Sequence, residues 1–363
     1  MHEFACAIDR AASRSGVLMA VRCGRIVAGR PGILSHLGRT ASPSQKACAR
    51  WCSTRPVVWY QSDKVPTSLT ATGKVGTYRD LAGSDEEFFG CDPVAVEVEV
   101  ASARGKPFSI DQNGFELMQH PWEHIDYYDN DAVLRKYYPE CEELVRKALG
   151  AKSVVAFDHN IRAKLKKDSG EELKKGNAVQ EPLITYGVHN DYSMSSAPRR
   201  IELLAQTPKA NDTLKPVLGD RPAIDPATVP ELLQRRYAFV NVWRSITSSP
   251  VERYPLGFID AKTVSTDDLV VFEIRYGDRI GENYFARHNS SHRWYYCPKM
   301  TKDEVVLLKC WDSRGADFAD ERHEGDLVPA TFSLHTGFDD PLTPKDAPDR
   351  ESIEVRTIVF YDK

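Results

Sequence analysis

The stretch Gly187-Val188-His189-Asn190-Asp191-Tyr192 overlaps residues 184–191, which we expect to form a strand. Side chains two positions apart in a strand point to the same face. We therefore expect His189 and Asp191 to face one side, with Asn190 between them pointing away. An imidazole and a carboxylate at this spacing can bind two adjacent positions on one metal ion. A distant histidine would complete a set of two histidines and one carboxylate that leaves further positions on the metal open.

The third ligand of this predicted metal site is a histidine from later in the chain. We predict His335, which ends the strand expected over 331–335, because a jelly roll brings its late strands back beside its early ones. Three alternatives stay open: His292 as the main rival, His288 as a weaker one, and His323 in a charged loop.

Many short strands separated by Gly, Pro, Asp and Ser make up the rest of the chain. This pattern predicts a mainly β fold, a double-stranded β-helix of the jelly-roll, cupin-like kind with flanking helices. Further strands are expected over 94–100, 152–159, 237–246, 269–276, 284–296, 305–311 and 353–361, and helices over 131–149, 198–205 and 229–236. In the first helix we expect Asn130 or Asp131 as the N-cap and a kink or split at Pro139.

A polar cluster follows His335 at the head of the last expected strand. Arg350, Ser352 and Arg356 share one face of that strand. A guanidinium holds a carboxylate through two parallel hydrogen bonds, and a nearby hydroxyl adds a third. We predict that Arg350 with Ser352 anchors the distal carboxylate of 2-oxoglutarate at the metal, with Arg356 as the alternative anchor. Taken alone, each arginine fits a surface ion pair equally well.

Other polar and aromatic residues are candidates for contact with a substrate. The predicted substrate residues are Tyr192, Arg162, Trp243 and Arg244. Trp243 shares a strand face with Asn241, whereas Arg244 points to the opposite face; if the first pair faces in, both are candidates for contact with the oxo-acid or the substrate. Core packing is the alternative role for both aromatic residues, and a surface ion pair is the alternative for Arg162. Asp312 is a candidate partner for a ligand histidine, with a turn cap as its alternative.

Composition excludes several classes of protein. The 363 residues carry a net charge of −4 at a pI of about 6.2, without the basic face that nucleic-acid binding requires. No apolar run approaches the roughly 20 residues that span a bilayer. The 8 cysteines form no paired C-x-x-C arrays, so we expect reduced thiols and a cytoplasmic protein.

The N-terminal segment 1–55 differs from the remainder in charge. Its only acids are Glu3 and Asp9, and serine and arginine are frequent. We expect a flexible tail that precedes a single jelly-roll domain over 56–363, whose N-terminal part is helical. A mitochondrial transit peptide is the alternative for this segment.

Eight sequence blocks in one order carry a resemblance to a known family. They are VAFDHNIR (155–162), VHNDYS (188–193), NVWRSI (241–246), YPLGFIDA (254–261), SHRWYYCPKM (291–300), EVVLLKCWDSR (304–314), LHTGFDDP (334–341) and RESIEVRTIVFY (350–361). The chain resembles the fungal and bacterial hydroxylase/desaturase family of Fe(II)/2-oxoglutarate oxygenases, which includes the aspergillic acid hydroxylase, the gibberellin desaturase and the cephamycin 7α-methoxylase component.

This resemblance implies an oxidoreductase that uses Fe(II), 2-oxoglutarate and O₂ to hydroxylate or desaturate an unactivated C–H bond of a small secondary metabolite. It places His189, Asp191 and His335 on the metal motif and Arg350 on the oxo-acid motif. The alternatives are a non-catalytic accessory barrel and a metal-dependent cupin that does not use 2-oxoglutarate. We expect a small-molecule substrate and no nucleic-acid or membrane partner, and we leave a homodimer open.

Overall fold

A computed structural model of the chain describes residues 53–80, 85–123, 125–164, 179–180, 182, 186–277, 279–318 and 327–362. Most of the basic N-terminal segment, residues 1–52, lies outside the described residues. Its last residues belong to the folded body, because Ser53–Thr54 forms strand β1 and the Thr54 hydroxyl donates to Asp340 at 2.6 Å. Strand β1 thus lies in the segment 1–55 that we expected to be a flexible tail.

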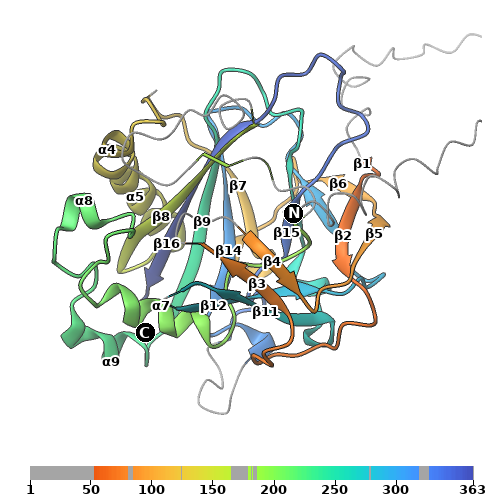
Figure 1. The fold of residues 1–363 in the computed structure, drawn as a ribbon. Coiled ribbons are helices and arrows are strands. Elements are labelled where there is room, and N and C mark those ends of the chain that lie inside the picture. Colours follow the sequence, from red (N-terminus) through yellow and green to blue (C-terminus); the bar gives the residue numbers. More distant parts are fainter. Residues whose placement is uncertain are drawn as a thin grey trace, which may run out of the picture. The chain divides into compact units, whose positions relative to one another are not determined.

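Two sheets have five strands each, and in the one with the longer strands, the large sheet, every neighbouring pair is antiparallel. Its order is β7 (Phe115–Gln119), β14 (Glu304–Asp312), β9 (Tyr237–Ser245), β16 (Glu351–Phe360) and β8 (Ser153–Ala163). Figure 1 shows these long strands side by side. Two of its three inner strands, β14 and β9, are buried along their whole length, as expected of strands with a packed layer on each face.

Shorter strands form the facing layer. One group runs β1, β6 (Val100–Ser102), β13 (Trp294–Tyr296), β10 (Leu256–Ile259) and β15 (His335–Gly337). The other runs β12 (Ile280–Ala286), β11 (Leu269–Arg275), β3 (Gly76–Arg79) and β4 (Asp85–Phe89), and β2 (Val57–Gln61) pairs with β5 (Pro93–Glu97). Phe115 of the large sheet packs on Phe258 of β10, with 4.2 Å between ring centroids, so the two layers meet in one core.

The segment around His189 joins the two groups of short strands. His189 forms one antiparallel bridge to Phe285 of β12 and another to His335 of β15. The strand that we expected over 184–191 is therefore reduced to a single pairing position among the described residues. Gly187 shows why, since its φ of 113° breaks an extended backbone and a side chain there would collide with Phe285.

Helices flank the large sheet. The expected helix 131–149 is split into α4 (Asn130–Ala132), a short π-helix η2 (Val133–Tyr137) and α5 (Tyr138–Leu149). Pro139 lies in the first turn of α5, where its missing N–H is tolerated, so the predicted split is confirmed. The N-cap is Asp129, one residue before those we expected, and it accepts from the N–H groups of Asp131 and Ala132. Helix α5 packs against β8 and β16 (Figure 1).

The remaining helical segments are short. They are α3 (Ile110–Asn113), α7 (Ser196–Leu204), α8 (Lys215–Leu218), η3 (Pro226–Thr228), α9 (Val229–Leu232), η4 (Ala261–Thr263), η5 (Thr266–Asp268) and η6 (Ala316–Phe318). Among the described residues, no helix is long and apolar enough to cross a membrane.

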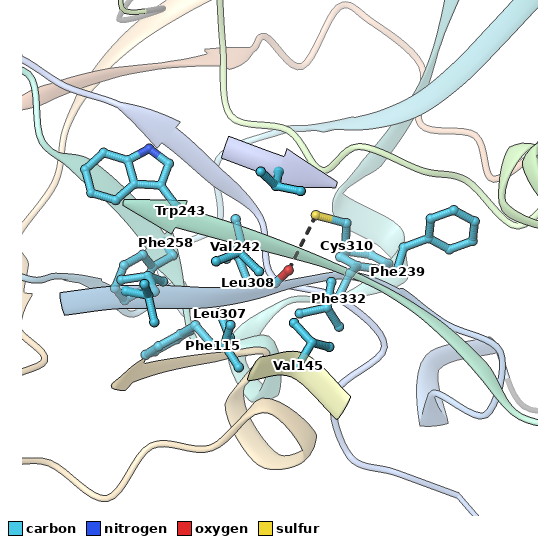
Figure 2. Close-up of a cluster of buried hydrophobic side chains, with 14 of the residues drawn as sticks. Phe115, Val145, Phe239, Val242, Trp243, Phe258, Leu307, Leu308, Cys310 and Phe332 are labelled. Carbon is cyan, nitrogen blue, oxygen red and sulfur yellow. Dashed lines mark hydrogen bonds between the residues drawn. The ribbon is translucent and has the colours of Figure 1, made fainter. Parts of the chain in front are cut away.

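Besides a smaller cluster of Val65, Val75, Val270, Phe272 and Phe285, a main apolar core fills the space between the layers and under the helices. Figure 2 shows part of it, with Phe239, Trp243 and Cys310 among the labelled side chains and the Cys310 thiol donating to the Leu308 carbonyl. The mainly β prediction is confirmed. The expected strand 284–296 is two strands, β12 and β13, separated by a loop.

Candidate active site

Three side chains gather between the layers at the point where the His189 segment meets β15. The ligand atoms of His189, Asp191 and His335 all lie within 4.8 Å of one another. Asp191 Oδ1 lies 4.0 Å from Nε2 of each histidine, which is too far for a hydrogen bond. Donor atoms about 2.1 Å from a shared ion stand closer together than this, so binding a metal would draw them inward.

Both histidines have their Nδ1 atoms engaged by backbone carbonyls. Nδ1 of His189 bonds to the Gly187 carbonyl at 2.8 Å, and Nδ1 of His335 bonds to the Ser333 carbonyl at 3.2 Å. A carbonyl accepts, so each Nδ1 carries the proton and each Nε2 presents a lone pair to the cluster. Burial, with a smaller contribution from His335, lowers the pKa of His189 to about 3, and a neutral ring is what a metal requires.

Asp191 uses its two oxygens differently. Oδ1 faces the histidines, whereas Oδ2 accepts from Asn241 Nδ2 at 2.7 Å and from Arg356 Nε at 3.4 Å. Burial raises the pKa of this carboxyl, but Arg356 and the two histidines lower it more, so the net pKa lies below its usual value. The carboxylate is therefore ionised and ready to bind a cation.

Asn190, between the two ligands, ties this turn to both layers. Its Nδ2 donates to the carbonyls of Tyr192 at 2.7 Å and Cys310 at 3.4 Å, and its Oδ1 accepts from Tyr284 N at 2.9 Å. Cys310 belongs to the large sheet and Tyr284 to β12. The side chain that we expected merely to point away thus holds the ligand turn in place.

Arg350 is the under-satisfied cation of the site. It is 4% exposed, its Nη1 donates to the Tyr254 carbonyl, and its Nε has no hydrogen-bond partner. Its guanidinium lies 5.6 Å from the Trp243 ring. Burial lowers its pKa to about 9, and the nearby Arg162 acts in the same direction. A buried guanidinium with one acceptor is arranged to receive an anion.

The other predicted anchor, Arg356, is already engaged. Its Nη1 donates to Asp158 at 3.0 Å and its Nε reaches Asp191. Ser352 is buried, and in the sheet register it lies opposite Arg162 of β8 and Ser245 of β9. Burial lowers the pKa of Arg162, and the nearby Glu354 partly offsets this.

Two of the predicted substrate residues lie elsewhere. Tyr192 is buried with its ring 4.1 Å from Phe239, so it packs in the core and does not line an open mouth. Arg244 lies on the outer face of β9, where it donates to Tyr137, to His120 and to the Lys302 carbonyl. Strand alternation carries it away from the ligands, and the structure does not bring it to the site.

Trp243 does reach the site, although as a buried side chain. Besides contacting Arg350, it lines a small, mostly apolar pocket with Val251, Pro255, Leu256, Phe258, Cys297, Met300 and Val306. This pocket has a volume of ≈ 10 Å³, which is enough for about one water molecule, so Trp243 belongs to the packed core beside Arg350.

The rival histidines have other environments. His292 bonds to Tyr60 through Nδ1 at 3.0 Å and to Asp268 through Nε2 at 3.2 Å, away from the ligand cluster. The His288 ring packs against Tyr60, and His323 lies outside the described residues. Asp312 contacts Arg236 and Lys309 and no ligand histidine.

The supporting roles of three residues were not predicted from the sequence. The amide of Asn190 and the carboxylate of Glu354, which accepts from Asn241 at 2.8 Å, both support the ligand region. Glu354 shares strand parity with Ser352 and Arg356, and that parity was a usable signal. The third is Tyr254, whose φ of 52° turns its carbonyl toward Arg350, and a Tyr-Pro pair carries no comparable signal.

Two histidines and one carboxylate gathered inside a mainly β fold form a group that could hold a metal ion and leave positions on it open for other ligands. A family model described as an oxidoreductase/YMDC permease-like domain matches residues 73–360. The Fe(II)/2-oxoglutarate-dependent dioxygenase nvfI of Aspergillus novofumigatus is 30% identical over 83% of this chain and 97% of its own length. An uncharacterized protein from the dcmA 3' region of Methylophilus leisingeri is 38% identical over 52% of this chain and 88% of its own.

The solved structure of the iron and alpha-ketoglutarate-dependent endoperoxidase NvfI shares the fold, with a TM-score of 0.63 and 24% identity over 86% of this chain and 99% of that one. Further relatives are named hydroxylase/desaturase. The chain belongs to this oxidoreductase family of Fe(II)/2-oxoglutarate-dependent dioxygenases, and it is an enzyme that uses Fe(II), 2-oxoglutarate and O₂.

Proposed function

We propose that His189, Asp191 and His335 hold the iron, and that Arg350 with Ser352 binds the distal carboxylate of 2-oxoglutarate. When bound, the iron and the oxo-acid supply the oxidation of an unactivated C–H bond by O₂. The chain's own residues position the metal ion, exclude water from Arg350 and Ser352, and hold the oxo-acid in one direction. The facing layers that carry these residues support a double-stranded β-helix as the fold.

The single observation that carries this proposal is the incomplete hydrogen bonding of Arg350. Leaving a buried guanidinium nitrogen without a partner is unfavourable unless a ligand completes it. Arg356 offers no such vacancy, because Asp158 and Asp191 already occupy it. We therefore assign the anchor to Arg350 and give Arg356 the task of holding Asp191.

The two rival functions are weakened by specific residues. A non-catalytic accessory barrel has no need of three converging ligands, and these are complete here. A metal-dependent cupin that does not use 2-oxoglutarate has no need of the buried Arg350. We propose a small metabolite as the substrate, with hydroxylation or desaturation as the outcome. A homodimer and a cytoplasmic location stay predictions from the sequence.

Anaerobic titration tests this proposal. Fe(II) is added to the protein, then 2-oxoglutarate, while the weak visible charge-transfer band of the chelated oxo-acid is followed. We expect the band to appear with both present and to need a much higher 2-oxoglutarate concentration in Arg350→Lys. A wild-type protein that binds Fe(II) without ever developing the band would contradict the proposal and favour the plain cupin.

A further inference from the structure

The buried Asn241 amide lies between two carboxylates. Its Nδ2 donates to Asp191 Oδ2 at 2.7 Å and to Glu354 Oε1 at 2.8 Å, so both amide protons are used. Asn241 is fully buried on the inner face of β9, and in the sheet register it lies opposite Arg356 of β16. A neutral residue thus connects a metal ligand to a second acid.

This arrangement fixes the direction of the amide. If the amide were reversed, Asn241 Oδ1 would face two carboxylate oxygens and no donor. In the observed direction Oδ1 is buried and has no hydrogen-bond partner among the described residues. The protein therefore tolerates one unpaired carbonyl oxygen while keeping both N–H groups on carboxylates. Glu354 therefore disfavours the reversed orientation of the Asn241 amide.

The consequence falls on Asp191, whose oxygens become inequivalent. Oδ2 receives Asn241 at 2.7 Å, and its other donors, Arg356 Nε at 3.4 Å and the Cys310 thiol at 3.8 Å, are more distant. Only Oδ1 is left facing Nε2 of His189 and His335. Asn241 is thus the closest group that prevents Oδ2 from turning toward the same point.

We propose that Asn241, aimed by Glu354, is a positioning residue that keeps Asp191 a single-oxygen ligand. This inference rests on the proposed function. A carboxylate can bind a cation through one oxygen or both. A second oxygen from Asp191 would occupy a position that the two chelating atoms of 2-oxoglutarate or O₂ require. Asn241 therefore controls the number of coordination positions that stay open on the metal, and it has little influence on whether the metal binds.

Asn241→Leu is the variant that tests this role, because it keeps the approximate volume and removes both donors. We expect it to weaken 2-oxoglutarate binding to the Fe(II) protein roughly 10- to 100-fold while leaving the Fe(II) Kd within about threefold of wild type. Both constants come from anaerobic titrations, the first from the charge-transfer band and the second from a competing chelator. Glu354→Gln should shift 2-oxoglutarate binding in the same direction by a smaller factor.

Asn113→Leu is the matched control. Asn113 is also a buried amide that donates to a carboxylate, Asp260, at 3.0 Å, but it lies in α3 and contacts no ligand. It should lower the Tm without changing either Kd. An Asn241→Leu protein with unchanged 2-oxoglutarate affinity, or with Fe(II) and 2-oxoglutarate affinities reduced by the same factor, would overturn the inference.

Two further outcomes keep the result decisive. If Asn241→Leu does not fold, Glu354→Gln decides alone, and an unaltered 2-oxoglutarate Kd in that variant overturns the inference. If the wild-type protein develops no charge-transfer band, the proposed function fails first. A band in wild type with no change in the variants leaves the proposed function intact and removes only the role of Asn241.

Discussion

Two buried arginines, one on each face of the large sheet, differ in how completely they are bonded. Arg244 on the outer face donates through Nε, Nη1 and Nη2 to three different residues. Arg350 at the inner face donates to the Tyr254 carbonyl alone, and its Nε is unpaired. Both are almost fully buried, so burial by itself does not distinguish them.

The difference separates a structural residue from a binding residue. A guanidinium whose donors are all used stabilises the protein that surrounds it, whereas one with unused donors is prepared for a ligand. Substitutions on the outer face of the large sheet should accordingly change the stability of the protein. Substitutions on its inner face should change ligand binding and catalysis. Variants on the two faces can therefore test this division.

The largest effect is expected for a metal ligand. His189→Ala removes one of three donors, so Fe(II) binding and turnover should both fall below detection, by roughly a thousandfold or more. Metal content after anaerobic loading and product formation measure the two. His292→Ala, which removes a buried histidine bonded to Tyr60 and Asp268, should keep one iron per chain. Loss of iron in His292→Ala instead would show that the ligand set is wrong.

The next effect concerns the inner arginine. Arg350→Lys keeps the charge but loses the planar fork, so the KM for 2-oxoglutarate should rise roughly 10- to 100-fold with a smaller change for the substrate. Steady-state kinetics against 2-oxoglutarate measures this. Arg356→Lys should instead weaken Fe(II) binding, because Arg356 holds Asp191. If the two variants exchange these effects, the anchor is Arg356.

On the outer face the expected loss is of stability. Arg244→Met leaves Tyr137, His120 and the Lys302 carbonyl without their donor, which should lower the free energy of unfolding by roughly 2–4 kcal/mol. Urea unfolding measures it. The KM for 2-oxoglutarate should stay at the wild-type value, and a rise in KM comparable with that of Arg350→Lys would abolish the division between the faces.

The smallest effect is a pH dependence on the outer face. His159 of β8 is fully buried beside Tyr138 of α5, and burial lowers its pKa from 6.5 to about 4. Below pH 6.5 the unfolded chain binds a proton that the folded chain does not. Stability should therefore fall between pH 6.5 and 4, by about 1 kcal/mol at roughly pH 5.5.

His159→Phe should flatten this part of the curve of Tm against pH, since phenylalanine has no proton to bind. The acid side of the curve below about pH 4 should persist in the variant, because Asp158, whose pKa is lowered, still has to be protonated there. An unchanged slope between pH 6.5 and 4 in His159→Phe would assign the effect to another group.

Strand alternation predicted much of the site. It put His189 beside Asp191 and gave Ser352 and Arg356 one face, and the split at Pro139 followed from proline chemistry. It could not choose between Arg350 and Arg356, because both have the same parity. The choice depends on the register of β8, which brings Asp158 opposite Arg356, and a register is set by pairing across the sheet.

Other features depended on contacts that no local pattern encodes. The expected strand 184–191 is shortened by the positive φ of Gly187, which its packing on Phe285 requires. The expected strand 284–296 is interrupted because Arg287 and His292 turn to bond with Val65 and Tyr60, more than 200 positions earlier. Apolar residues on both sides of that loop hid the interruption.

The three hydrogen bonds of Asn190 have a consequence for designers who transplant such metal centres. Moving only the two flanking ligands onto another barrel would leave their turn without its connection to Tyr284 and Cys310. A graft must therefore carry an amide at the middle position, together with one strand that offers an N–H and another that offers a carbonyl. The portable part of this turn is therefore a tripeptide with two receiving strands, and the strand that carries His335 must accompany it.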